Sequence, residues 1–196
     1  MQNKTTETIR ESITLKNKMA GDAHLMVQVD RAADLMISTL REGRRVLFCG
    51  NGGSAADAQH LAAELSGKFY LNRRALNAEA ININIPFLTA VSNDYDYSYS
   101  YARYLEGAAR PGDVLVLLST SGTSANIVRA AEYARKEGIH TIAFTGESGG
   151  HLLSLADIIL RIPSADTPRI QEAHMLLGHI ICEEVESRIF PVTPAP

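Results

Sequence analysis

An imidazole and a carboxylate stand four residues apart in the stretch AADAQHLAAELS, at His60 and Glu64. The stretch reads as a helix, and residues four apart share one face of a helix. An imidazole and a carboxylate on one face are groups that can act in acid–base chemistry. The same spacing is also that of an ordinary solvated pair, so these two residues alone do not decide between the two interpretations.

The segment before this helix has the features of an anion site. Val46–Cys49 is a short apolar run typical of a buried strand, and Gly50, Gly52 and Gly53 interrupt it. We expect the helix to begin at about Ser54, which is a good N-cap residue. Glycines let backbone N–H groups approach a phosphate, and the helix dipole favours its charge. The turn therefore predicts a phosphate site beside the helix that carries His60.

Two nucleotide-binding motifs fit this turn less well. Gly50-x-Gly52-x-x-Ala55 matches a relaxed dinucleotide fingerprint, but the next predicted strand ends in Ile83-Asn84-Ile85 and offers no acidic residue for a ribose. A P-loop would require Gly-Lys-Ser/Thr after the turn, and that sequence is missing.

A second loop of small hydroxyl residues, Ser119–Ser124, follows the aliphatic run Val114–Leu118. The loop contains no Lys or Arg, so it would bind phosphate through hydroxyl and backbone N–H groups, which suits a small phosphorylated metabolite. An ST-rich turn with Ser124 as N-cap explains the same residues. Taken alone, the loop leaves both interpretations open.

The last predicted helix, from about Pro168 to Ile189, carries further polar residues. Its apolar surroundings predict that His179 is at least partly buried. His174 is interpreted as a satisfied core histidine. The acidic residues near the end of the helix are expected to form an exposed face: Glu183, Glu184 and Glu186.

Composition limits the class of protein. The chain has 196 residues, of which 45% are hydrophobic, and a formal net charge of −3, which disfavours a nucleic-acid binder. Cys49 and Cys182 have no metal spacing and are predicted to be buried thiols. No apolar run approaches the roughly 20 residues of a membrane span, and the N-terminus lacks the apolar region of a signal peptide. We expect no membrane association and a cytoplasmic location.

Strands and helices alternate along the chain, which predicts a doubly wound parallel α/β sheet. Five strands are expected, at Val46–Cys49, Glu79–Ile85, Val114–Leu118, Ile139–Phe144 and Asp157–Ile162. The flavodoxin-like order 2-1-3-4-5 makes strands one and three neighbours, so both small-residue loops lie at the switch point where ligands bind. Residues 95–109 are expected to form another helix. The predicted domains are an N-terminal helical oligomerisation segment (1–43), the sheet domain (44–190) and a flexible tail (191–196).

Five separated motifs resemble those of phosphoheptose isomerases, a branch of the sugar isomerase (SIS) domain proteins. They are Gly50-Asn51-Gly52-Gly53-Ser54, His60-x-x-x-Glu64, Asn93-Asp94, Ser119-Thr120-Ser121-Gly122-x-Ser124, and Arg169-Ile170-Gln171-Glu172 with His179. The resemblance covers residues 45–185 and implies a flavodoxin-like SIS domain, a homotetramer and a phosphorylated seven-carbon sugar as substrate. It implies an aldose–ketose isomerase that converts sedoheptulose 7-phosphate to D-glycero-D-manno-heptose 7-phosphate through an enediolate, in bacterial heptose synthesis for surface polysaccharide.

The resemblance also implies roles for single residues. The phosphate would be held by Ser54, Ser119, Thr120, Ser121 and Ser124. The sugar would be lined by Asn51, Gly52, Gly53, Asn93 and Asp94, with Glu64 and Gln171. One Zn²⁺ per subunit would be bound by His60, Glu64, Gln171 and His179. The acid–base pair would be Glu64 and His179. Asp166 matches an aspartate whose role is open, and Lys68 stands where some relatives carry Arg.

Geometry adds one expectation to this set. On one continuous helix Gln171 and His179 are separated by about 12 Å of rise, so a single metal ion would need both side chains to stretch, or ligands from two chains. We therefore expect the active site at or near a subunit interface. The alternative function is a non-catalytic SIS tetramer that binds the replication initiator protein. Such proteins lack the acid–base residues at the positions of Glu64 and His179, and both are present here.

Overall fold

A five-stranded parallel sheet with the order β2-β1-β3-β4-β5 forms the centre of the computed structural model, which describes residues 3–191. The strands are β1 (Val46–Gly50), β2 (Ala78–Ala80), β3 (Val114–Leu118), β4 (His140–Thr145) and β5 (Ile158–Arg161). The predicted flavodoxin-like order is confirmed. In the register of the central pair, Val46 faces Val114 and Gly50 faces Leu118, so β1 and β3 end at the same level.

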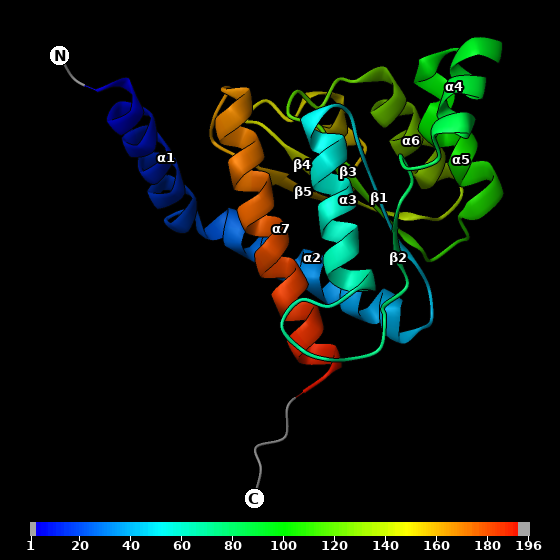
Figure 1. The fold of residues 1–196 in the computed structure, drawn as a ribbon, viewed down its shortest axis with the longest axis horizontal. Helices are drawn as coiled ribbons and strands as arrows, with labels where there is room; N and C mark the ends of the chain where they lie inside the picture. Colours follow the sequence, from blue (N-terminus) through cyan, green and yellow to red (C-terminus); the bar gives the residue numbers. More distant parts are fainter. Residues whose placement is uncertain (1–2, 192–196) are drawn as a thin grey trace, which may run out of the picture.

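Helices cover both faces of the sheet (Figure 1). Within residues 3–191 they are α1 (Lys4–Ala20), α2 (Ala23–Arg41), α3 (Gly53–Ser66), α4 (Ile85–Asp94), α5 (Ser100–Ala108), α6 (Ala125–Lys136) and α7 (Thr167–Ile189), with short 3₁₀ helices η1 (Tyr97–Tyr99) and η2 (Gly150–Ser154). The helices α2, α3 and α7 cover one face, and α5 and α6 cover the other.

Alternation along the central strands explains the two layers. Val46 and Phe48 of β1 point into the core shared with α2, α3 and α7, whereas Leu47 and Cys49 point into the core shared with α5 and α6. Both faces of these strands are buried, which is why their sequences read as continuous apolar runs. Cys49 and the second cysteine, Cys182, are buried free thiols, as the sequence predicts.

The second strand is much shorter than its sequence predicts. It ends at Ala80 rather than at Ile85. Asn82 turns away from the sheet and donates its side-chain N–H to the carbonyl of Ala55 in α3. Asn84 then caps α4 by accepting from the N–H of Phe87. Pro86 lies in the first turn of that helix, where its missing N–H leaves no bond unmade. The predicted helix over 95–109 is likewise divided, into η1 and α5.

The first helix, α1, extends away from the sheet (Figure 1). Two polar contacts join it to α7: Ser12 Oγ donates to Glu172 at 2.8 Å, and Arg169 donates to the carbonyl of Thr8 at 3.2 Å. Its apolar side chains Ile9 and Ile13 are about half exposed. Of the predicted 191–196 tail, residues 192–196 lie outside the described part of the chain.

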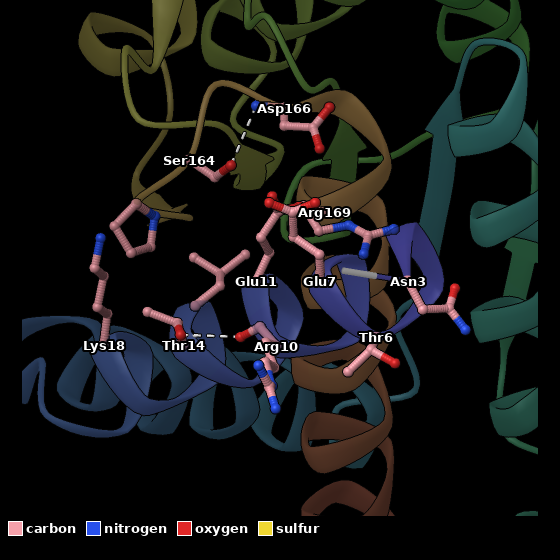
Figure 2. A pocket seen from close by; sticks show the side chains of 12 residues that line it. Asn3, Thr6, Glu7, Arg10, Glu11, Thr14, Lys18, Ser164, Asp166 and Arg169 are labelled. Carbon is pink, nitrogen blue, oxygen red and sulfur yellow. Dashed lines mark hydrogen bonds between the residues drawn. The ribbon is translucent and has the colours of Figure 1, made fainter. Parts of the chain in front are cut away.

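A cavity of about 720 Å³ lies between α1 and the segment that leads into α7. Figure 2 shows its lining, which includes Arg10 and Glu11 of α1 on one side and Ser164, Asp166 and Arg169 on the other. The backbone N–H of Asp166 is held by Ser164 Oγ at 3.1 Å. Asp166, whose role the sequence left open, therefore lines this cavity.

Candidate active site

Three ionisable side chains from two helices meet at one point on the surface. His60 and Glu64 lie one turn apart on α3, and Nε2 of His60 is 3.1 Å from Oε1 of Glu64. His179 reaches them from α7, with its Nε2 3.1 Å from Nε2 of His60. One ligand atom from each residue lies within 4.8 Å of the other two. The cluster joins residues 119 positions apart in the chain.

A glycine permits the helices to approach closely beside this cluster. A Cβ on Gly178 would lie 2.6 Å from both methyl carbons of Leu61, which precludes any side chain there without a shift. Cys182, one turn further along α7, is buried in the same contact, and its thiol faces the carbonyl of Leu61. Since Leu61 follows His60 and Gly178 precedes His179, this close packing positions both imidazoles.

The donor set of this cluster fits a metal ion. Two imidazole nitrogens and one carboxylate oxygen are the ligands that zinc takes in three-residue sites, which leave a fourth position open. Each imidazole directs Nε2 inward, and the carboxylate supplies the negative charge that a divalent cation requires. His60, Glu64 and His179 could therefore hold a metal ion within one chain.

Gln171, the fourth predicted metal ligand, lies away from this cluster. Its side chain packs against Gly53 at the start of α3, where a Cβ would meet Gln171 Nε2 at 2.6 Å. The two helices run side by side in the same direction, so Gln171 faces the beginning of α3 and His179 faces its second half. A groove of about 660 Å³ connects the two positions, with both Gln171 and His179 in its wall.

Asp57 also lines this groove and has no counterpart in the sequence-based expectations. It lies one turn before His60 on the same face of α3. Burial raises the pKa of its carboxyl group, while the nearby His60 opposes that effect. Its Oδ2 has no hydrogen-bond partner within residues 3–191. The signal was available in the sequence, because Asp57, His60 and Glu64 follow helical spacing.

The two predicted phosphate loops lie side by side at the carboxyl ends of β1 and β3. The side-chain amides of Asn51 in the first loop and Asn126 in the first turn of α6 are hydrogen-bonded at 2.8 Å. Tyr97 also donates to Asn51 Oδ1, at 2.9 Å. Neither Asn126 nor Tyr97 was singled out in the sequence. The burial of Asn126, a polar residue just inside a helix, is visible only in the fold.

The first loop corrects the predicted start of α3. Gly52, not Ser54, is the N-cap residue, and its φ of 56° is one that glycine adopts readily. Ser54 lies inside the first turn of the helix and is buried. The helix begins earlier because Gly52 and Gly53 can bring the chain round more tightly than the sequence pattern suggests.

The hydroxyl groups of the second loop shape the loop itself. Ser119 Oγ accepts from the N–H of Gly122 at 3.2 Å and lies 3.5 Å from Ser124 Oγ. Ser121 Oγ accepts from the N–H of Thr123. The hydroxyl groups thus form the expected ST turns, and Ser124 is the N-cap of α6 without a side-chain capping bond. Phosphate binding by this loop stays a prediction. Thr120 and Ser121 line a cavity of about 200 Å³ together with Ser164.

The remaining predicted site residues, Asn93 and Asp94, lie at the end of α4. Their side chains are exposed and hydrogen-bonded to each other at 2.9 Å. The chain continues directly into η1, whose Tyr97 reaches Asn51 in the first loop. This segment is therefore connected to the first of the two predicted phosphate loops through Tyr97.

The sequence also predicts the environment of two other residues of the last helix, His174 and Glu186. His174 is fully buried, and its Nε2 faces the carbonyl of Thr145 at 3.3 Å, which agrees with a core histidine, although its Nδ1 has no partner within residues 3–191. Glu186 was expected on an exposed face, and that expectation is wrong. It is 2% exposed and pairs with Arg73, 113 residues away.

Comparisons with known proteins decide the family. The family model described as "SIS domain" matches residues 15–146. A protein of Mycobacterium tuberculosis (strain ATCC 25177 / H37Ra) named phosphoheptose isomerase is 50% identical over 184 residues, which cover 94% of each chain. The chain belongs to the phosphoheptose isomerase branch of the SIS domain family.

Solved structures of phosphoheptose isomerases have the same fold. The structure from Francisella tularensis is 36% identical with a TM-score of 0.90, covering 94% of this chain and 97% of the other. The structure from Neisseria gonorrhoeae is 39% identical with a TM-score of 0.87, covering 95% and 98%. The resemblance seen in the motifs is confirmed: the chain is an SIS domain enzyme of the phosphosugar isomerase class. Among residues 3–191, no helix combines the length and apolarity that crossing a bilayer requires.

Proposed function

We propose that this SIS domain enzyme interconverts sedoheptulose 7-phosphate and D-glycero-D-manno-heptose 7-phosphate. The observation that carries the proposal is the meeting of Glu64 with His179, a carboxylate and an imidazole from opposite parts of the chain. The names of the relatives supply the heptose phosphate as substrate. The alternative, a non-catalytic SIS tetramer, is not favoured because those proteins lack both acid–base residues.

Aldose–ketose isomerisation moves a proton between two adjacent carbons through an enediolate. Glu64 would take the proton from one carbon and return it to the neighbouring one. Either His179 or a bound Zn²⁺ would act on the oxygens on those carbons. The hydroxyl and backbone N–H groups of the two loops would hold the phosphate, and Asn51, Asn93 and Asp94 would line the sugar.

His60, Glu64 and His179 would hold Zn²⁺ in each subunit, on the strength of their donor set. A zinc ion there would polarise the sugar oxygens as a Lewis acid. Gln171 of the same chain packs at the start of α3 instead, so its predicted role as a ligand would require a neighbouring chain.

The spacing of the site supports an active centre at a subunit interface. From Ser54 to Glu64 the helix rises by roughly 15 Å. An extended seven-carbon sugar phosphate is about 10 Å long, given C–C bonds of about 1.5 Å. Measured along the helix, the predicted phosphate loops and the acid–base pair of one chain are thus separated by more than the length of an extended substrate, which favours a contribution from a neighbouring chain. We infer a homotetramer in which residues 1–43 contribute to assembly and neighbouring chains complete each site.

We further propose a place in bacterial heptose synthesis for surface polysaccharide, and the cytoplasmic location stays a prediction from the sequence. The test is direct. Purified protein is incubated with sedoheptulose 7-phosphate, and the aldose product is followed by NMR, with Glu64→Gln as the matched variant. We expect aldose formation by the wild type and a loss of at least about 100-fold in the folded variant. Activity retained by Glu64→Gln would refute the role of Glu64, and an inactive wild type would refute the proposed reaction.

A further inference from the structure

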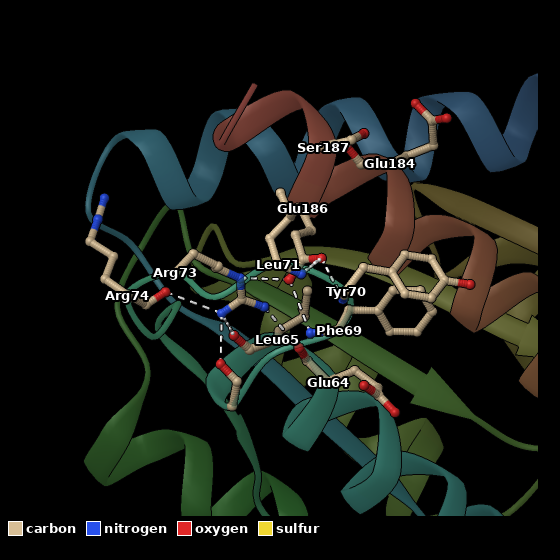
Figure 3. A network of polar contacts seen from close by, with 11 residues as sticks. Glu64, Leu65, Phe69, Tyr70, Leu71, Arg73, Arg74, Glu184, Glu186 and Ser187 are labelled. Atoms are coloured by element: carbon tan, nitrogen blue, oxygen red, sulfur yellow. Dashed lines mark hydrogen bonds and ion pairs between the residues drawn. The ribbon is translucent and has the colours of Figure 1, made fainter. Parts of the chain in front are cut away.

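A buried ion pair joins the loop after α3 to the end of α7. Nε of Arg73 donates to Oε1 of Glu186 at 2.8 Å, and the two side chains are 3% and 2% exposed. Figure 3 shows that the loop carrying Arg73 wraps around the end of α7, with the Glu186 carboxylate enclosed between them. An apolar pair of similar volume often stabilises a core equally well, so stability alone does not account for two buried charges.

The other donors of Arg73 hold the end of α3. Nη2 donates to the carbonyl of Glu64 at 2.9 Å, and Nη1 donates to the carbonyls of Leu65 and Gly67 at 2.8 and 2.9 Å. The last carbonyls of a helix lack partners within the helix, and a guanidinium there also complements the helix dipole. One side chain thus fixes the turn of α3 on which the proposed catalytic Glu64 stands.

Glu186 holds the same loop from the other side. Its carboxylate accepts from the backbone N–H groups of Phe69, Tyr70 and Leu71 at 2.7–3.0 Å. Burial would raise its pKa, but these bonds and Arg73 outweigh that effect, so the pKa lies below its usual value. Glu186 lies two turns after His179 on α7. The bond to the Phe69 N–H holds the backbone that carries the Phe69 ring, whose centroid is 5.8 Å from the His179 ring.

We propose that Arg73 and Glu186 are positioning residues for the isomerase, because their pair fixes the separation of Glu64 on α3 from His179 on α7. This inference rests on the proposed function. Neither residue touches the acid–base cluster by its side chain. Arg73 acts through the carbonyl of Glu64, and Glu186 acts through the helix of His179 and through Phe69. Displacements of about 1 Å at a reacting centre can cost 100-fold in rate, so a small loosening of this pair has a measurable effect.

The test uses two variants and one control in the full-length protein. Glu186→Gln keeps the shape and one acceptor but removes the charge. Arg73→Lys keeps the charge but, with a single ammonium, cannot bind Glu186 and the carbonyls of α3 together. The control is Arg188→Gln, which removes the exposed ion pair to Asp34 at the same end of α7 and leaves the loop untouched.

We expect both variants to lower kcat for sedoheptulose 7-phosphate by at least about tenfold while KM changes by less than about threefold. Arg188→Gln should leave both constants within about twofold of the wild type. Crystal structures of the folded variants should show a changed separation of Glu64 from His179. If Glu186→Gln fails to fold, Arg73→Lys decides by the same measurements.

Folded variants with wild-type kcat, or with an unchanged separation of Glu64 from His179, would overturn the proposal, as would an equal loss in the Arg188→Gln control. An inactive wild type would refute the proposed function instead. In that case the crystallographic comparison still decides whether this pair sets the separation.

Discussion

Nε2 of His60 on α3 lies 3.1 Å from Nε2 of His179 on α7. At this distance only one of the two nitrogens can donate a proton to the other, so at least one presents a lone pair. Lone pairs on facing imidazoles, with the Glu64 carboxylate alongside, are what a divalent cation requires. The relationship between these two residues therefore leads to the first prediction.

His179→Ala should weaken Zn²⁺ binding by at least about tenfold, because a lost ligand costs at least as much as a lost neighbour of a ligand. Isothermal titration with Zn²⁺ measures the change. His151→Ala, at an exposed histidine of η2, serves as control and should bind as the wild type does. Equal affinity of the His179→Ala and wild-type proteins would show that zinc binds elsewhere.

Replacing Ser119 by Ala should raise KM for the sugar phosphate by about tenfold or more, since a hydrogen bond to a charged group contributes about 1.5–3 kcal/mol. The effect on kcat should be small because the hydroxyl is remote from Glu64. Steady-state kinetics separates the two constants. Ser187→Ala, which removes an exposed hydroxyl from α7, is the control. An unchanged KM would mean that Ser119 serves only the loop, through its bond to Gly122.

Asn126→Ala should loosen the two predicted phosphate loops from each other and destabilise the protein by about 1–3 kcal/mol, because it leaves the amide of Asn51 without this partner. KM should rise together with the loss of stability. Urea unfolding and steady-state kinetics on the same preparation provide both numbers. A variant with the stability and KM of the wild type would contradict the coupling of the loops.

Gly178→Ala should destabilise the fold by about 1–3 kcal/mol, because the added methyl would press on both methyl groups of Leu61. It should also push His179 away from His60 and reduce activity. Gly107→Ala is the matched control: a Cβ there meets nothing within 4 Å in α5, so stability should stay equal or rise. Thermal unfolding compares the two. Equal melting temperatures would mean that the contact between α3 and α7 can accommodate an added methyl group.

The stability of the protein should fall as the pH drops from about 6.5 toward 4. Burial lowers the pKa of His174 to about 4, and the bond to Thr145 opposes that shift only in part. Below pH 6.5 His174 binds a proton in the unfolded chain but stays neutral in the folded protein, so ΔG of unfolding decreases with decreasing pH. At pH 5 the loss is about 2 kcal/mol relative to pH 7.5.

Urea unfolding of the wild type and His174→Gln at the two pH values measures this contribution. The variant should lose less stability on acidification than the wild type. His24→Gln, at an exposed histidine of α2, should behave as the wild type does. Identical pH dependence of His174→Gln and wild type would exclude His174 as the source.

Local sequence was sufficient for most of the fold. The strand Val114–Leu118 is as predicted, because a parallel strand buried on both faces is recorded in its own residues. The adjacency of the two phosphate loops followed from the strand order. The prediction that Glu186 is exposed was wrong because its partner, Arg73, comes from a loop that no sequence periodicity connects to α7. The predicted end of β2 at Ile85 was wrong because Asn82 donates to a helix carbonyl 27 residues away, which ends the strand early. Contacts at long sequence separation decided both.

For the candidate site, the residue types in the sequence predicted which residues belong to it, and the fold shows which of them lie together. His60, Glu64 and His179 do come together, and how closely they do so depends on packing such as that of Gly178 on Leu61, which the sequence does not reveal. Gln171 shares a helix with His179 and still lies elsewhere, since eight residues are more than two turns. Asn126 and Tyr97 are recognised as part of the candidate site only by their hydrogen bonds to Asn51, which no local sequence pattern predicts.

Because the first half of α1 has few contacts with the rest of its own chain, hydrogen exchange in this helix can report whether subunits have assembled. Leu15 and Met19 anchor the second half of α1 in the core, whereas its first half is held by little more than the Ser12–Glu172 and Arg169–Thr8 contacts. In an isolated chain the amides of residues 4–11 should therefore exchange with deuterium long before those of the sheet. Slow exchange in the same amides at working concentration would then report, without any substrate, that another subunit covers Ile9 and Ile13.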